Sequence, residues 1–396
     1  MIPLSSSASY SKKRISTQFV NCDNYISVDN ILQNKAGISR ATNFSLNYGD
    51  IPKYEDNHIL VGNIRPYLKK IWFANKTGGC SPDVLNFEIN DGFDSKFVYY
   101  CLLADTFFIH MMKGAKGSKM PRGDKNQIMS FLIPQLGLPE QIKISSILSK
   151  IDEKIQLNNK ISTKLEIMAK LIYDYWFVQF DFPNKNGKPY KTSGGKMEWN
   201  QELKRKIPEG WKKTKLSQVA NIIMGQSPPG DSYNQDDNGP IFYQGSTDFG
   251  NRYPTIRKYT TTPLRFAKKG DILLSVRAPV GDMNIANHDC CIGRGLAALN
   301  SKIGAQGYLY EVMKYFKQVF DIKNGNGTTF GSITKDDLFN LPLVCPPNQL
   351  IMQFEAVISP MYARQNLIEI ENQKLIRLRD WLLPMLMSGQ IKVRQN

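Results

Sequence analysis

The densest group of cations in the sequence lies in a glycine-rich stretch. Residues 113–125 read KGAKGSKMPRGDK and contain five Lys or Arg and three Gly. Glycine lets backbone N–H groups approach a phosphate closely, and cations attract it, so this composition is typical of a loop that contacts nucleic acid. A solvated loop without a ligand is the alternative. The residues expected to touch DNA here are Lys116, Ser118, Lys119, Arg122 and Lys125.

Other stretches contain residue types that bind bases or phosphates. Residues 323–332 read KNGNGTTFGS, a second glycine loop with fewer charges and more hydroxyls. Residues 225–230 read GQSPPG, in which the amide of Gln226 is of the kind that pairs bidentately with adenine. The further residues expected to contact DNA are Arg65, Lys69, Gln226, Ser227, Tyr233, Arg277, Asn326, Thr328 and Thr329. For each of them, an ordinary surface residue or turn is the alternative.

The overall charge indicates a polyanionic partner. The formal net charge is +16 and the isoelectric point is about 9.4. Such an excess attracts polyanions, and nucleic acid is the partner class that we expect from charge. A protein that is basic only because its organism favours Lys codons is the alternative.

The sequence contains no catalytic or metal-binding motif. The six cysteines show no CxxC spacing and there are only three histidines, so neither a zinc site nor a disulfide framework is expected. A GxxxxGK[ST] phosphate loop is missing as well. Because no catalytic motif is found, we expect a protein that is not an enzyme. Because there is no run of eighteen apolar residues and no signal-peptide pattern, we expect it to be soluble and cytoplasmic.

Two long segments must position these loops. The first, residues 139–177, has apolar residues every seven positions in two rows, which is typical of a coiled coil. A helix buried in a large core is the alternative. The aromatic end, residues 173–177, is expected to pack against a domain or a partner subunit. The expected contact positions are Ile144, Ile147, Ile151, Asn158, Ile161, Leu165, Met168 and Ile172.

The second long segment, residues 353–387, has the same spacing. Pro360 and Pro384 are expected to kink or end this helix and to limit its regular part to residues 361–383. Two such segments in one chain can pair with each other. The expected contact positions are Met361, Ile368, Leu375, Leu378 and Leu382.

The chain contains an internal duplication. Residues 114–144 align with residues 325–352, with Lys125 on Lys335, and a long helical segment follows in each copy. The period of about 210 residues indicates a duplicated domain and not a solenoid. If a twofold axis relates the copies, the two helices run antiparallel. We expect an α+β protein with two related globular parts separated by an antiparallel two-helix coiled coil.

Five segments are expected. They are a globular domain, a long helix, a Pro-, Gly- and Lys-rich linker, a second globular domain, and a second long helix with the C-terminal tail, at residues 1–138, 139–180, 181–210, 211–348 and 349–396. Within the first domain, residues 97–112 are expected to form one amphipathic helix.

Four motifs complete the pattern. They are YISVDNILQNKAGI at residues 25–38, YDYWFVQFDFP at 173–183, IPEGWKKTKLSQVANIIMGQSPPG at 207–230 and LRDWLLPMLMSGQI at 378–391. Each is loose alone, but with their order and the duplication the whole chain resembles the specificity (S) subunit of type I restriction-modification systems. The first domain lacks the usual Trp-centred start of that family, so its N-terminal strand is expected to be altered or shortened.

The resemblance implies DNA recognition without catalysis. It implies two target-recognition domains that each read half of a bipartite, asymmetric site in double-stranded DNA, and helices that set the spacing and dock two methyltransferase (M) subunits. S-adenosylmethionine, ATP and Mg²⁺ would be bound by the M subunits and by restriction-translocase (R) subunits. A self-associating or scaffolding coiled-coil protein remains an alternative. A fused restriction enzyme is a third, and it would need nuclease or methyl-transfer activity in the isolated chain.

Overall fold

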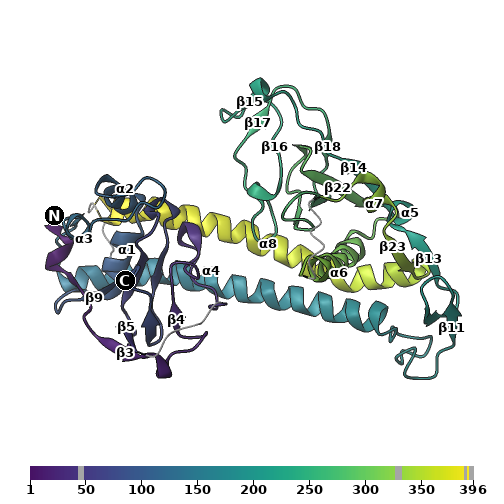
Figure 1. Cartoon of the computed structure of the whole chain (residues 1–396), viewed down its shortest axis with the longest axis horizontal. Helices are drawn as coiled ribbons and strands as arrows, with labels where there is room; N and C mark the ends of the chain where they lie inside the picture. The colour runs from purple at the N-terminus through teal and green to yellow at the C-terminus, as the bar shows by residue number, and fades with distance from the viewer. Residues whose placement is uncertain (43–48, 326–331, 388–389, 392–396) are drawn as a thin grey trace. The chain divides into compact units, whose positions relative to one another are not determined.

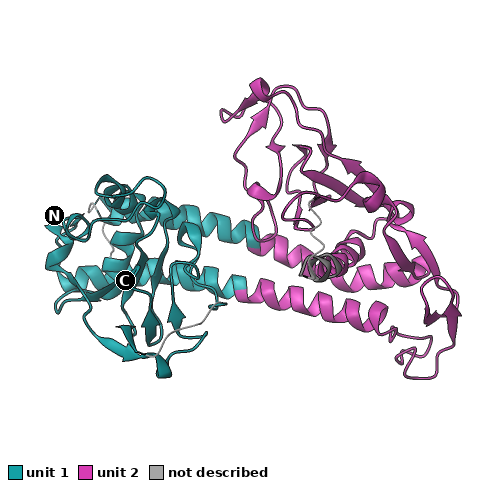
Figure 2. Ribbon diagram, viewed as in Figure 1, with its two compact units in different colours: residues 1–159, 369–396 teal, residues 160–368 magenta. Residues whose placement is uncertain are grey.

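The computed structural model describes residues 1–42, 49–325, 332–387 and 390–391 (Figure 1). The chain forms two compact units (Figure 2). Unit 1 comprises Met1–Asn159 and Glu369–Asn396, and unit 2 comprises Lys160–Ile368. Both combine small sheets with helices, which confirms the α+β class. Within the described residues, no helix is both long and apolar enough to cross a membrane.

Unit 1 contains two four-stranded sheets and one two-stranded sheet. The first sheet has the order β2 (Ala8–Tyr10), β9 (Val84–Ile89), β6 (Ile59–Gly62) and β7 (Ile71–Phe73). The second has the order β3 (Arg14–Ser16), β5 (Asp50–Tyr54), β8 (Gly78–Cys80) and β4 (Tyr25–Ile26). The two-stranded sheet pairs β1 (Ile2–Pro3) with β10 (Leu132–Ile133).

Unit 2 repeats this arrangement and has further two-stranded pairs. Its four-stranded sheet has the order β14 (Ala220–Met224), β22 (Leu296–Ser301), β19 (Ile272–Ser275) and β20 (Met283–Ile285). A three-stranded sheet has the order β16 (Phe242–Tyr243), β21 (Cys290–Ile292) and β18 (Phe266–Ala267). The two-stranded pairs are β13 (Lys212–Lys215) with β23 (Pro342–Cys345), β15 (Tyr233–Asn234) with β17 (Tyr259–Thr260), and β11 (Met197–Asn200) with β12 (Arg205–Pro208).

The strand pairings confirm the internal duplication. The sheet β2-β9-β6-β7 of unit 1 has the same chain-order topology as β14-β22-β19-β20 of unit 2. One parallel pair also recurs, β4 with β8 and β16 with β21. In each unit an early strand pairs antiparallel with the strand that precedes the long helix, and β1 has two residues where its counterpart β13 has four.

The shorter helices follow the same duplication in part. Unit 1 has α1 (Ser95–Leu103), α2 (Asp105–Lys113) and α3 (Lys125–Met129), whereas unit 2 has α5 (Leu216–Val219), α6 (Gln306–Gly325) and α7 (Lys335–Phe339). In chain order α6 takes the place of α1 and α2, and α7 takes the place of α3. The prediction of one helix over residues 97–112 is wrong, because Ala104 is extended with ψ of 142° and separates α1 from α2. Asp105 then starts α2, where its negative charge favours the helix N-terminus.

Both long helices are built into the cores of the units. In unit 1, Ile144 and Leu148 of α4 (Leu138–Tyr173) and Leu383 of α8 (Asn348–Met387) belong to the same apolar cluster as Phe87 and Phe97. In unit 2 the aromatic end of α4 continues into a π-helical turn, Asp174–Val178, and joins a cluster of aromatic rings. The aromatic residues of that cluster are Tyr173, Trp176, Phe177, Phe180, Phe182, Trp211, Tyr308, Tyr310, Phe316 and Phe354.

The two long helices pack together and run antiparallel. In unit 1, Asp152 of α4 accepts a hydrogen bond from Arg379 of α8 at 2.8 Å, and Asn158 contacts Asn372 at 2.9 Å. In unit 2 the amide of Gln365 donates to the carbonyl of Ser162 at 2.8 Å. Rising residue numbers on α4 thus meet falling numbers on α8, as the sequence predicted.

The heptad pattern holds in the first predicted row of each helix and fails in part of the second. On α4, Ile144 and Asn158 are buried, and Ile147, Ile151, Ile161, Leu165 and Ile172 are half-buried. On α8, Ile368 is buried, and Met361, Leu375 and Leu382 are half-buried. The predictions for Met168 and Leu378 are wrong, since these side chains are 48% and 44% exposed.

The true second row lies one residue later than predicted on both helices. On α4 it contains Leu148, Ile155, Ser162 and Ala169 and continues to Trp176 in the π-helical turn, and on α8 it contains Ile358, Gln365, Asn372, Arg379 and Leu386. All of these residues are buried or half-buried. The spacing from the first row is therefore four residues and not three, which is still a heptad pattern.

The prolines do not interrupt α8. The helix runs without a break from Asn348 to Met387, so the predicted limits at residues 361 and 383 are wrong. Pro360 and Pro384 both lie on the exposed side of the helix. Water can therefore bind the carbonyl groups that each proline leaves without a helical N–H partner.

Residues 181–210, expected to be a linker, are folded. They contain the β11–β12 hairpin, and Phe182 and Ile207 are buried in the core of unit 2. Asp181 accepts hydrogen bonds from the backbone and hydroxyl of Thr192 at 2.8 and 2.6 Å. The Gly- and Lys-rich composition marks turns within a small subdomain.

We expect the buried amide pair to stabilise the helix pairing. Asn158 is fully buried and donates to Asn372, which in turn donates to Asn159 at 2.8 Å. Asn372→Ala removes an acceptor and a donor and should lower the free energy of unfolding by about 1–3 kcal/mol. Urea titration measures this, with Gln373→Ala at the exposed neighbouring position as the control. Equal urea midpoints for the two variants would contradict the prediction.

Candidate nucleic-acid interface

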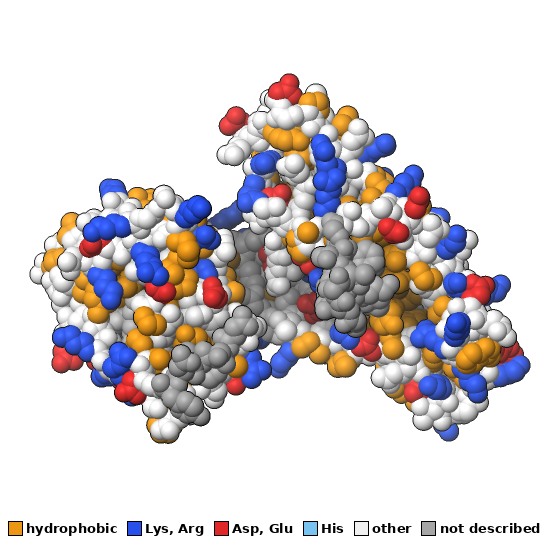
Figure 3. All heavy atoms as spheres, in the orientation of Figure 1, with side chains coloured by type: hydrophobic (Ala, Val, Ile, Leu, Met, Phe, Trp, Pro, Cys, Tyr) orange, Lys and Arg blue, Asp and Glu red, His pale blue; other side chains and the backbone are white. Residues whose placement is uncertain are grey.

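Basic side chains are spread over the visible face of both units (Figure 3). They do not gather in one large patch in this view. Among the described residues no group of His, Cys, Asp and Glu is arranged to hold a metal ion. On this face, charge alone therefore does not mark a site.

Three loops of unit 1 meet at one edge of the first sheet, where β6 ends and β9 begins. We call them loop edge 1, and they are residues 63–69, 81–83 and 114–124. The backbone N–H of Asn63 donates to the carbonyl of Asp83 at 3.0 Å. The N–H of Arg65 donates to the carbonyl of Pro121 at 2.8 Å. These bonds bring the glycine loop against the segment that carries Arg65.

The glycine loop is a tight hairpin. Lys116 and Arg122 exchange two backbone hydrogen bonds of 3.0 and 2.9 Å. Gly117 has φ of +97°, and a Cβ atom there would lie 3.3 Å from the carbonyl oxygen of Met120. The hairpin therefore presents the predicted side chains at an exposed tip. Those side chains are Lys116, Ser118, Lys119 and Arg122, and all four are exposed.

Two acidic side chains lie beside this hairpin. Asp83 Oδ1 is 3.1 Å from Arg122 Nη2, and Asp124 Oδ2 is 3.9 Å from Lys116 Nζ. Both pairs are at the surface, where an ion pair contributes little stability. Both cations are therefore held only weakly by these carboxylates.

The start of α3 fixes the end of the glycine loop. Asp124 caps the helix, and the N–H that it accepts from Gln127 lowers the pKa of its carboxyl group. Lys125 follows, with Nζ 5.5 Å from the ring centroid of Tyr10, whose hydroxyl donates to the Lys125 carbonyl at 3.1 Å. The ammonium group of Lys125 therefore already has a partner within the chain, the ring of Tyr10.

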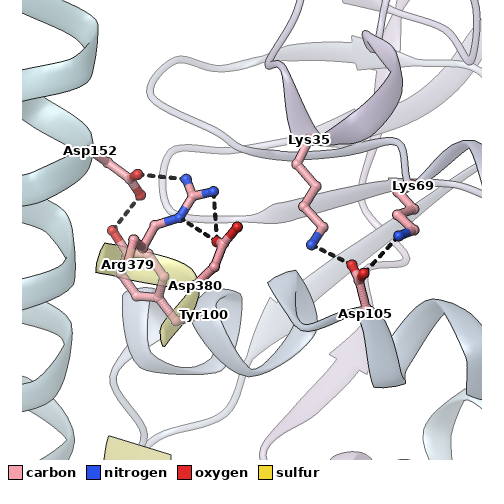
Figure 4. A network of polar contacts seen from close by, with 7 residues as sticks. All are labelled: Lys35, Lys69, Tyr100, Asp105, Asp152, Arg379 and Asp380. Carbon is pink, nitrogen blue, oxygen red and sulfur yellow. Dashed lines mark hydrogen bonds and ion pairs between the residues drawn. The ribbon is translucent and has the colours of Figure 1, made fainter. Parts of the chain in front are cut away.

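Arg65 and Lys69 have different surroundings. Arg65 is exposed and has a left-handed backbone with φ of 52°. Lys69 Nζ forms an ion pair of 2.7 Å with Asp105, whose other oxygen binds Lys35 at 2.6 Å (Figure 4). The hydrogen bonds from Lys35 and Lys69 lower the pKa of Asp105. Lys69 thus anchors the loop to α2 and Arg65 remains available for a ligand.

Unit 2 has an equivalent edge, where β19 ends and β22 begins. Loop edge 2 contains residues 225–227, 276–279 and 293–295. The N–H of Val276 donates to the carbonyl of Gly295 at 2.9 Å, the same pairing that Asn63 and Asp83 make in unit 1. The N–H of Gln226 donates to the carbonyl of Ile292 at 3.0 Å, which leaves its exposed side chain at this edge.

Tyr233 has a structural role beside this edge. Its hydroxyl donates to the carbonyl of Pro228 at 2.9 Å, and its ring stacks on Phe242 with centroids 4.8 Å apart. The structure therefore uses Tyr233 to hold the GQSPPG turn, and the side chain is only half-exposed.

Arg277 lies where the second glycine loop returns. It forms a β-bridge with Ser332, just as Ile64 does with Arg122 in unit 1. Arg277 is exposed at loop edge 2. The remaining predicted contacts in this loop, Asn326, Thr328 and Thr329, lie outside the described residues.

One exposed cation at loop edge 2 was missed by the sequence interpretation. Arg294 lies between Gly293 and Gly295, and its Nε donates to the hydroxyl oxygen of Ser227 at 3.3 Å. The Gly-Arg-Gly tripeptide directly before a strand was the signal that could have found it. The equivalent turn of unit 1, residues 81–83, has the acidic residue Asp83 and no cation.

Each long helix also has a second, outward-facing apolar stripe. On α4 and the π-helical turn that follows it, this stripe contains Leu157, Met168, Leu171 and Tyr175, which are 53%, 48%, 60% and 40% exposed. On α8 it contains Leu367, Ile370, Leu378 and Trp381, which are 57%, 43%, 44% and 54% exposed. Spacings that are sums of three and four residues place each set on one helix face. Exposed apolar stripes of this kind are typical of protein–protein contacts.

The comparisons with known proteins agree with this architecture. The family model "Type I restriction modification DNA specificity domain" matches residues 5–167 and 208–379. The MjaX type I restriction enzyme specificity subunit of Methanocaldococcus jannaschii is 34% identical over 278 residues, which are 68% of this chain and 62% of the relative. The MjaIX specificity subunit of the same organism is 25% identical over 77% of this chain and 71% of its own length.

A solved structure supports the fold. The crystal structure of a type I restriction-modification S subunit from M. genitalium is 17% identical and aligns over 97% of this chain and 95% of its own, with a TM-score of 0.56. The two matched regions of the family model each contain one loop edge and most of one long helix. The chain therefore belongs to the family of type I restriction-modification specificity subunits.

Proposed function

We propose that the chain reads a bipartite DNA site, with unit 1 binding one half and unit 2 binding the other. The duplicated loop edge is the observation that supports this most directly. In both units, the loop after β6 or β19 is joined to the turn before β9 or β22 by an equivalent backbone hydrogen bond, and the bridge of Ile64 with Arg122 recurs as that of Arg277 with Ser332. Their exposed side chains differ, with Lys119 and Arg122 in unit 1 and Gln226 and Arg294 in unit 2. Different side chains on one framework suit an asymmetric site.

Phosphate binding and base reading are divided among these residues. The hairpin tip of unit 1 has Lys116 and Lys119, which are point charges suited to phosphates. Arg65 and Arg122 carry guanidinium groups that can donate to two acceptors of one base, and the amide of Gln226 can donate to N7 of adenine and accept from its N6 amino group. The rest of the chain holds these groups in place and supplies no chemistry.

The outward stripes of α4 and α8 are the proposed docking sites for two M subunits. Trp381 is the largest exposed side chain of the α8 stripe and lies beside charged neighbours such as Asp380, which resembles the anchor and rim of a protein interface. The M subunits would bind S-adenosylmethionine and methylate adenine. R subunits, using ATP and Mg²⁺, would cleave unmodified DNA.

A triple substitution in the hairpin tip tests the DNA-reading role. Lys116→Ala, Lys119→Ala and Arg122→Ala together should weaken binding of the assembled methyltransferase to its site. Because Lys116 and Lys119 are the proposed phosphate contacts, the slope of log K against log salt should fall by about 2, since each phosphate contact contributes about 0.9. DNA binding at several salt concentrations measures both effects, and methylation at the half-site of unit 1 should decrease.

The matched control replaces three exposed lysines of the folded segment 181–210. Lys185, Lys188 and Lys191 lie away from both loop edges in sequence and are exposed. Their replacement with Ala changes the net charge equally and should leave the salt slope unchanged. Circular dichroism shows whether both triple variants are folded. Identical DNA affinity of the hairpin variant and the wild type would disprove the role of this loop.

A further inference from the structure

Arg294 lies on a turn that its surroundings hold rigidly. The turn joins β21 to β22, and the N–H groups of Gly293 and Gly295 donate to the carbonyls of Tyr243 and Gln244 at 2.8 and 3.2 Å. A Cβ atom on Gly293 would lie 2.9 Å from Gln244 Cα, and one on Gly295 would lie 2.7 Å from the Gln244 carbonyl oxygen. Both flanking positions therefore require glycine, and Arg294 is the residue of this turn with an exposed side chain.

A neighbouring loop fixes the direction of the Arg294 side chain. The hydroxyl oxygen of Ser227 accepts from the Arg294 backbone N–H at 3.2 Å and from Nε at 3.3 Å. Ser227 is itself held, because Gly225 N–H donates to the Leu296 carbonyl at 2.9 Å. A Cβ atom on Gly225 would lie 2.2 Å from the Gly293 carbonyl oxygen, so the backbones of the two loops are in direct contact.

This arrangement leaves one edge of the guanidinium open. Nε points to Ser227, and the terminal Nη1 and Nη2 groups have no hydrogen-bond or ion-pair partner in the described part of the chain. No carboxylate neutralises the charge there, in contrast to Arg122 and its partner Asp83. Two parallel N–H donors at a fixed position match a ligand with two acceptors side by side.

Two groups of DNA offer such acceptors. Guanine presents O6 and N7 in the major groove, and a phosphate presents two oxygens. A phosphate contact needs no fixed side chain, because the charge acts over a distance and in many orientations. A serine that orients the guanidinium is useful when the ligand has a fixed plane, as a base does.

We propose that Arg294 reads a guanine in the half-site bound by unit 2, and that Ser227 is the positioning residue for its guanidinium. This inference rests on the proposed DNA-reading function. It adds the class of base and the two side chains that select it. The guanine belongs to the half-site of unit 2, since Arg294 and Ser227 both lie within that unit.

The test maps methylated adenines after the full chain is assembled with its M subunits. A plasmid library with randomised half-sites serves as substrate. Arg294→Ala should relax one G·C position of one half-site, with a loss of discrimination on the order of 10- to 100-fold. The other half-site should keep its sequence. Arg294→Lys should restore overall affinity but not the preference for guanine, since an ammonium group lacks the two parallel donors.

Two further variants separate positioning from folding. Ser227→Ala should weaken discrimination at the same base position by a smaller factor, and Ser227→Thr, which keeps the hydroxyl, should restore it. Lys302→Ala is the control, because Lys302 follows the opposite end of β22 and donates to the Ser217 carbonyl. It should leave the motif unchanged.

Two results would overturn the inference. If Arg294→Ala weakens methylation of all sites equally and leaves the motif intact, Arg294 contacts a phosphate. If the motif and the rate both stay the same, Arg294 is a surface cation. The proposed function itself would fail differently, because the wild-type complex would then show no bipartite motif at all.

Discussion

Inserting one heptad into both long helices is expected to abolish methylation at the natural site and to move it to a site with a spacer about three base pairs longer. Seven residues lengthen a helix by about 10 Å, and three base pairs of duplex span about the same length. The insertions belong after Asn159 in α4 and after Ile368 in α8, where the chain passes between the units. Methylated-adenine mapping reads the new spacer directly.

The contacts on either side of these points make the experiment feasible. Asn158 meets Asn372 on one side and Ser162 meets Gln365 on the other, so the two insertions face each other across the helix pair. A full heptad keeps the alternation of three and four residues in both rows. Insertion into α4 alone is the control, since it separates Ser162 from Gln365 and should destabilise the protein. Methylation that persists at the original spacer in the double insertion would refute the idea that helix length sets it.

Trp381→Ala is expected to weaken docking of one M subunit by roughly 30- to 1,000-fold. A buried Trp anchor contributes about 2–4 kcal/mol at the centre of a protein interface, and each 1.4 kcal/mol is a factor of ten. Trp381 belongs to the unit 1 part of the α8 stripe, together with Ile370 and Leu378. The α4 stripe, which is the other proposed docking site, is unchanged. Size-exclusion chromatography with light scattering should therefore show one M subunit per chain in place of two.

Trp199 provides a matched control for this experiment. It is 57% exposed, close to the 54% of Trp381, but it lies on the β11–β12 hairpin. Trp199→Ala should leave both M subunits bound. Complexes of two M subunits with the Trp381 variant at unchanged affinity would show that the stripe is not the docking site.

The heptad rows show what a single sequence can and cannot predict. The first row was found because most of its members are apolar, as Ile144 and Ile368 are. The second row was misplaced because its buried positions include Ser162, Gln365, Asn372 and Arg379, whereas the outward stripe has Met168 and Leu378. Polar side chains are buried at low cost only when partners exist across the interface, and those partners lie about 200 residues away in the sequence.

The sequence composition pointed to individual loops, but the contacts within them depend on the fold. The composition of residues 113–125 located the hairpin tip of unit 1. The same reasoning assigned Lys69 and Lys125 to DNA, although folding brings Asp105 and Tyr10 next to them. Arg294 was missed because its importance depends on Ser227, which lies 67 positions earlier in the chain. Such pairings follow from the strand topology and not from local composition.

The polar row between α4 and α8 also determines which helix each of them pairs with. Asp152 binds Arg379 at 2.8 Å, and Lys154 Nζ is 3.4 Å from Glu371 Oε1, so each helix offers charges that are complementary to the other. Both helices belong to one chain, which gives each an effective concentration of its partner on the order of millimolar. A second copy at micromolar concentration competes poorly with that intramolecular partner. We therefore expect α4 and α8 to pair within one chain and not between two copies, which leaves the outward stripes exposed.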